Sequence, residues 1–156
     1  MTADRGPLHL EGRYQYEDRE TVSLFVGWGF ELGDELTLEL VPMVGAVAGR
    51  TDGIAPALEL TLAWGPLELY SESEYVVDLE EGADSFFYAW SELSGWPTEW
   101  LRVGAALQRT RVFEAAREVS AGPLIGLAVG RLSATFYLLE PGRDEQFAIA
   151  SVGASF

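Results

Sequence analysis

Side-chain character alternates with a strict two-residue period along much of this chain. In the closing segment, residues 147–156, every second side chain is apolar: Ala148, Ala150, Val152, Ala154 and Phe156. Residues 21–32 repeat the pattern more strongly, with one parity made of Val22, Leu24, Val26, Trp28, Phe30 and Leu32. Because successive side chains of a β-strand point to opposite faces, the pattern predicts strands with one apolar face.

Composition excludes several other folds. The chain has 156 residues and is 48% hydrophobic, yet it holds no apolar run near the roughly 18 residues that a membrane-spanning helix needs. Its 17 glycines and 7 prolines recur between short alternating segments, as in an all-β chain with many turns. The absence of cysteine excludes disulfides and thiolate metal sites. The length suits a single domain, residues 1–156.

The alternation predicts about ten strands, with boundaries accurate to about two to four residues. We place them at residues 8–18, 20–32, 35–49, 54–64, 67–79, 85–95, 99–113, 121–130, 132–140 and 145–156. Short turns at 33–34, 65–66, 96–98 and 130–131 alternate with longer, charged connections. Short turns on one side and long loops on the other are typical of a closed, antiparallel, up-and-down transmembrane β-barrel.

Aromatic residues also favour a membrane location, because amphipathic rings concentrate at the two faces of a bilayer. The set expected near the short turns is Trp28, Phe30, Trp64, Trp96, Trp100 and Phe156, and the set near the long connections is Tyr16, Tyr75, Phe86, Phe87 and Phe113. A soluble barrel or sandwich with ordinary core aromatics is the alternative. The apolar closing strand with its terminal Phe resembles the last strand of bacterial outer-membrane barrels, which places the protein in that membrane.

The parity opposite the leucines is polar and should line the interior. The predicted lumen-lining residues are Glu11, Arg13, Glu39, Glu59, Glu72, Glu74, Glu92, Arg102 and Gln108. An exposed charge in the hydrocarbon would cost roughly 2–4 kcal/mol at the midplane, so these groups must line water or pair internally. We expect Arg102 to pair with Glu92 or with Glu72 and Glu74, and Arg13 to pair with carboxylates on adjoining strands.

A longer stretch, FFYAWSELSGWPTEWLRVGAALQRTRVF, resembles small uncharacterised outer-membrane β-barrel proteins of Gram-negative bacteria. The likeness continues through ELYSESEYV and the terminal SVGASF, and so covers most of the chain. It implies the barrel architecture and assigns lumen or wall positions to Glu72, Glu74, Trp90, Glu92, Arg102 and Gln108. It implies no catalytic role.

The sequence offers little support for an enzyme. Outer-membrane hydrolases use a histidine near the outer rim, whereas the only histidine here, His9, begins the first predicted strand. Glu72, Glu74 and Glu92 could form a glycosidase-like carboxylate pair, but interior carboxylates are common in barrels. The acidic loop at residues 78–84 could bind Ca²⁺ weakly, yet it lacks the spacing of a calcium loop. We therefore predict no catalytic residues, no metal site and no cofactor.

The net negative charge of the chain limits which partners it can bind. The formal net charge of −15 opposes binding to nucleic acid. The first predicted function is a narrow pore or passive transporter, which the interior carboxylates would make selective for small cations. The alternative is a plugged structural or adhesive barrel, and a soluble lipocalin-like carrier is a weaker third class. We expect a monomer that contacts outer-membrane lipid or detergent, in a chain whose secretory leader has been removed.

Overall fold

The computed structural model describes residues 1–15, 21–49, 52–79, 85–112 and 118–154. These residues form twelve β-strands in one antiparallel sheet. The strands are β1 (Thr2–Arg5), β2 (Leu8–Gln15), β3 (Thr21–Trp28), β4 (Phe30–Leu32), β5 (Leu36–Ala48), β6 (Gly53–Trp64), β7 (Leu67–Asp78), β8 (Phe86–Thr98), β9 (Leu101–Val112), β10 (Glu118–Val129), β11 (Leu132–Leu139) and β12 (Phe147–Ala154). Among the described residues, no helix is long and apolar enough to cross a membrane.

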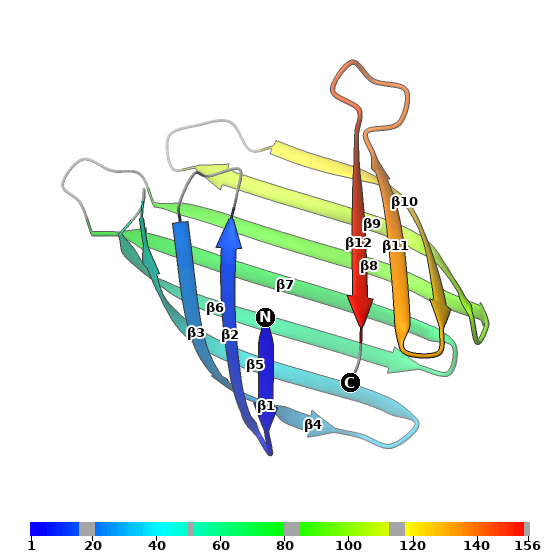
Figure 1. The fold of residues 1–156 in the computed structure, drawn as a ribbon, viewed down its shortest axis with the longest axis horizontal. Helices are drawn as coiled ribbons and strands as arrows, with labels where there is room; N and C mark the ends of the chain where they lie inside the picture. The colour runs from blue at the N-terminus through cyan, green and yellow to red at the C-terminus, as the bar shows by residue number, and fades with distance from the viewer. Residues whose placement is uncertain (16–20, 50–51, 80–84, 113–117, 155–156) are drawn as a thin grey trace.

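The topology is up-and-down, as the alternation predicts. Each strand pairs antiparallel with its neighbours in the order β1-β2-β3-β5-β6-β7-β8-β9-β10-β11-β12, and β4 pairs with β5. The sheet curls strongly, so that its two ends stand in front of the central strands in Figure 1. An all-β antiparallel meander of this kind is therefore confirmed.

The predicted count of about ten strands is wrong, because β1 was not foreseen and the predicted strand at residues 20–32 is divided into β3 and β4. β1 pairs with β2 through a turn at Gly6, whose φ of 61° suits glycine. β4 continues the register of β3 along β5, but the two are separated at Gly29, whose N–H donates instead to the Pro7 carbonyl at 2.7 Å. The predicted turn at 96–98 is also misplaced. β8 runs on to Thr98 through a register irregularity that begins at Gly95.

The prediction of a closed barrel is wrong for this structure, because β1 and β12 are not paired with each other. The physical reason lies in β1. It pairs along the edge of β2, so the order of paired neighbours contains eleven strands, an odd number. With every neighbour antiparallel, β12 then runs in the same direction as β1, so antiparallel pairing of these two end strands is impossible.

The two faces of the sheet match the predicted parities. On β3, Leu24 is 66% exposed on the convex outer face, whereas Phe25 is 3% exposed on the concave inner face. Leu38, Leu60 and Leu107 share the outer parity. Phe25 also covers Gly45, its cross-strand partner on β5, where an added Cβ would lie 2.5 Å from the ring. Glycine at this position leaves the space on the inner face that the Phe25 ring occupies.

Part of the predicted aromatic distribution is revised. Trp28, Phe30, Trp64 and Trp100 are each at least half exposed at the end of the sheet that carries the short turns. Phe86, expected at the lipid face, instead packs against buried side chains inside the curl, because it shares the parity of Glu92. Tyr16, Phe113 and Phe156 lie outside the described residues.

Candidate functional site: the polar interior

The concave face of the sheet gathers most of the predicted lumen residues around one guanidinium. Arg13 on β2 contacts Glu72 and lies 2.7 Å from Glu11, 3.1 Å from Glu74 and 3.8 Å from Glu59. We call these five residues the Arg13 cluster. Sequence reasoning placed the partners on adjoining strands, and this is wrong for most of them. β2 and β7 are four places apart in the sheet, and the curl brings them face to face.

The Arg13 cluster carries an unbalanced charge. One guanidinium faces four carboxylates, which leaves a formal surplus of three negative charges when all are ionised. The arginine side chain is only 16% exposed, so water screens these charges incompletely. Arg13 also lies 4.7 Å from the Phe25 ring centroid, where the aromatic face adds a cation–π contact. The Arg13 cluster therefore concentrates negative charge on the concave face.

A second group of polar side chains converges on Glu92 of β8, and we call it the Glu92 cluster. Arg102 lies 2.8 Å from one Glu92 carboxylate oxygen, a pair that the sequence predicted. Trp90 Nε1 and the Tyr137 hydroxyl both donate to the other oxygen, at 2.6 and 2.8 Å. Arg102 Nε also donates to Ser94 at 3.0 Å. The cluster ties β8 and β9 to β11, because Tyr137 reaches three places across the sheet.

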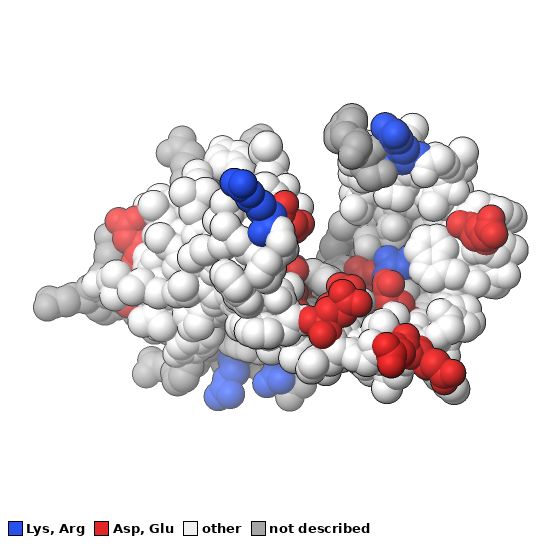
Figure 2. All heavy atoms as spheres, turned by 90° about the horizontal axis from the view of Figure 1, so that it is seen from below, with Lys and Arg blue, Asp and Glu red and all other residues white. Residues whose placement is uncertain are grey.

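The remaining predicted lumen residues lie at the margins of these clusters. Gln108 is half-buried on the inner parity of β9, opposite Trp90 in the register. Glu39 on β5 is exposed near the short-turn end. The acidic loop considered for Ca²⁺ has residues 80–84 outside the described part of the chain. Figure 2 shows acidic and basic side chains inside a notch between the two ends of the sheet.

Two groups of buried apolar side chains also lie on the concave face. At the end of the sheet with the long connections, one buried group spans β3 to β7 and consists of Phe25, Met43, Val47, Ala55, Ala57 and Val76. We call it the apolar interior cluster. A second group lies beside the Glu92 cluster and consists of Ala106, Leu124, Tyr137 and Leu139. The concave face is thus occupied by packed side chains as well as by ion pairs.

Sequence reasoning missed the surroundings of His9. The residue is 8% exposed on the inner face of β2, and its Nδ1 lies 2.7 Å from Asp4 Oδ1 on β1. Its Nε2 is buried without a hydrogen-bond partner, 4.0 Å from Glu11 Oε2. The available signal was the i, i+2 spacing of His9 and Glu11, which puts both side chains on one face of a strand.

Comparison of the chain with protein-family models, with curated proteins and with solved structures found no match.

Proposed function

We propose that this protein is a bacterial outer-membrane β-barrel-type protein whose outer face contacts lipid and whose interior is closed by side chains. The observation that carries the proposal is the convex face, where large apolar side chains are exposed on strand after strand. Among them are Leu24, Val26, Val44, Ile54, Trp64, Leu93, Leu107, Ile125, Leu127, Phe136 and Val152. Soluble monomers rarely expose a contiguous apolar patch of more than a few hundred Å².

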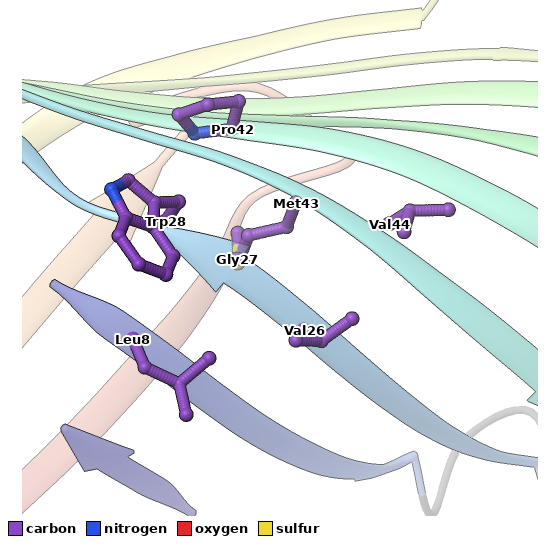
Figure 3. Close-up of a pocket in the computed structure, with 7 residues that line it drawn as sticks. All are labelled: Leu8, Val26, Gly27, Trp28, Pro42, Met43 and Val44. Atoms are coloured by element: carbon purple, nitrogen blue, oxygen red, sulfur yellow. The ribbon is translucent and has the colours of Figure 1, made fainter. Parts of the chain in front are cut away.

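The outer face has a shallow depression that suits the acyl chain of a lipid. A depression of about 340 Å³ opens around Gly27, between Leu8 on β2, Trp28 on β3 and Val44 on β5 (Figure 3). Its floor is the backbone at Gly27 and Met43, two positions whose side chains point to the inner face, where Met43 occupies the space that a Cβ at Gly27 would need. Every lining residue is apolar. An acyl chain of a surrounding lipid would fill this depression without meeting a charge.

Membrane residence places a requirement on the two edges of the sheet. Unpaired backbone groups in hydrocarbon cost several kcal/mol each, so spanning sheets have no open edge. β12 runs antiparallel to β2, by the same argument from strand order that excludes antiparallel pairing with β1. We therefore propose that β12 pairs with β2 in the bilayer, after β1 leaves that edge.

Two functional classes follow from the interior, and its packing favours the closed one. Phe25 and Val76 are 3% and 1% exposed, which leaves little room for a continuous water path at that end. The barrel then acts as a structural or ligand-binding element of the membrane. The surplus negative charge of the Arg13 cluster is the observation that supports the second candidate, a narrow pore for small cations. Planar-bilayer recording distinguishes the two.

Lipid contact is tested by tryptophan quenching in vesicles that contain brominated lipid. A variant that keeps only Trp64, which is 63% exposed on the outer face, should lose several-fold in fluorescence. A matched variant that keeps only Trp90, whose indole donates to Glu92 inside the curl, should be quenched much less. Circular dichroism checks that both variants retain β-structure. Equal quenching, or a monodisperse protein in buffer without detergent, would contradict the proposal and favour the soluble carrier.

Pairing of β12 with β2 is tested by disulfide cross-linking. The chain has no cysteine of its own, so only the introduced cysteines can react. Leu10→Cys on β2 is combined in turn with Ala148→Cys, Ala150→Cys or Val152→Cys on β12. We expect one pair to form a disulfide in vesicles, since cross-strand Cα atoms then lie within the usual 4.4–6.8 Å. Leu10→Cys with Leu127→Cys on β10 is the control and should stay reduced. No cross-link in any combination would show that the β2 edge stays apart from β12.

A further inference from the structure

Three potential metal ligands converge on the concave face, from strands far apart in the sequence. They are His9 and Glu11 on β2 and Glu59 on β6, and each offers one ligand atom within 4.8 Å of the others. His9 and Glu11 share a face because they are two residues apart on one strand. The curl of the sheet brings Glu59 to them. Carboxylates are common in such an interior, whereas a buried imidazole is a ligand that suits transition metals.

The His9 ring is arranged as a metal-binding imidazole. Its side chain is 10% exposed, and its Nδ1 lies 2.7 Å from the Asp4 carboxylate. An ionised carboxylate only accepts hydrogen bonds, so Nδ1 carries a proton, and in the neutral ring Nε2 then presents a lone pair. That Nε2 is buried with no hydrogen-bond partner, 4.0 Å from Glu11 Oε2. A buried acceptor without a donor is costly, and a cation at this point would satisfy it.

The electrostatics at this point also favour a cation. Glu11 and Glu59 belong to the Arg13 cluster, in which four carboxylates share a single guanidinium. Arg13 donates to Glu11 Oε2 at 2.7 Å, which leaves the other oxygen of that carboxylate as a ligand. Arg13 also keeps its contacts with Glu72 and Glu74. A divalent ion would reduce the formal surplus of negative charge from three to one.

We propose that His9 Nε2, Glu11 and Glu59 bind a divalent transition-metal ion of the zinc class, and that Asp4 holds the imidazole in its binding orientation. Zinc takes imidazole nitrogen at about 2.0–2.1 Å and carboxylate oxygen at about 2.0–2.2 Å, so the ligand atoms must draw together to roughly 3.3 Å. Ca²⁺ and Mg²⁺ prefer all-oxygen sites, and they leave Nε2 unused. Metal-bound histidines usually donate their other N–H to a carboxylate, as His9 does to Asp4. The site requires β1 on the edge of β2, because Asp4 lies on β1 opposite His9. It therefore belongs to the open sheet of this structure, before β12 pairs with β2, and does not depend on lipid contact.

The test uses the full chain in detergent micelles with Zn²⁺ alone as the probe. His9 is the only histidine, so ¹⁵N-histidine labelling gives one set of ring signals. We expect the Nε2 resonance to move with one equivalent of Zn²⁺ after chelator treatment, whereas Mg²⁺ leaves it in place. An unchanged ring signal, even if Zn²⁺ binds elsewhere on this acidic protein, overturns the proposal.

Variants measured by calorimetric Zn²⁺ titration separate the roles of the residues. His9→Gln should weaken binding by more than about 100-fold, and Asp4→Asn by about 10- to 100-fold, the usual effect of losing a histidine-orienting partner. Glu68→Gln is the matched control, because Glu68 contacts Arg102 rather than Arg13. This variant should bind Zn²⁺ with the affinity of the wild-type protein. Equal affinity in wild type and His9→Gln overturns the proposal. If His9→Gln fails to fold, the ring signal of the wild-type protein decides the question.

Discussion

Replacing Arg13 with methionine should destabilise the protein by about 3–5 kcal/mol, because the change leaves four carboxylates on the concave face without their shared cation. The side chain is mostly buried, so solvent cannot replace the guanidinium fully. Methionine keeps most of the aliphatic length beside Phe25, which limits the loss of packing. Urea unfolding in detergent micelles, followed by tryptophan fluorescence, measures the change in the free energy of unfolding.

Two further variants show whether charge is the cause of that loss. Adding Glu72→Gln and Glu74→Gln to Arg13→Met should recover part of the stability, since the removal of two negative charges relieves the repulsion. Arg143→Met is the matched control. Arg143 pairs with Glu140, but its side chain is 73% exposed, so we expect a loss of no more than about 1 kcal/mol. Equal effects of Arg13→Met and Arg143→Met would mean that the Arg13 cluster contributes little to stability.

The strands and their two faces could be predicted from sequence because both depend on local backbone geometry. Side chains alternate between faces with a period of two, whatever the rest of the chain does. The outward Leu24 and inward Phe25 follow directly from that period. Strand β1 was missed because residues 2–5, Thr-Ala-Asp-Arg, have no apolar alternation. Its pairing depends on the turn at Gly6 and on β2 as a template.

The arrangement of the interior could be predicted only in part, because it depends on the curl of the whole sheet. The Arg102–Glu92 pair joins adjacent strands, and the parity of each strand was enough to suggest it. Contacts between Arg13 and Glu72 or Glu74 join β2 to β7, and no local pattern specifies which strands face each other across a curl. Closure depends likewise on the edge strands, and the unforeseen β1 changes the strand order at one edge.

In planar bilayers the wild-type protein should carry no resolvable current, because the apolar interior cluster closes one end of the curl. Truncating the largest side chain of that cluster, Phe25→Ala, should produce small conductance steps. Leu24→Ala is the matched control, since Leu24 is the next residue on β3 but is exposed on the outer face. The Leu24→Ala variant should produce no resolvable current. The measurement is single-channel recording at equal protein density for all three proteins.

The ion preference of any current identifies what lines the path. A path opened beside Phe25 passes the Arg13 cluster, because the guanidinium lies over the Phe25 ring. Its surplus of carboxylates should then make the Phe25→Ala current prefer cations, and adding Glu72→Gln and Glu74→Gln should weaken that preference. Anion preference would contradict the charge assignment. Steps from the wild-type protein would instead favour the cation pore over the closed barrel, since the interior side chains would then leave a continuous path for water.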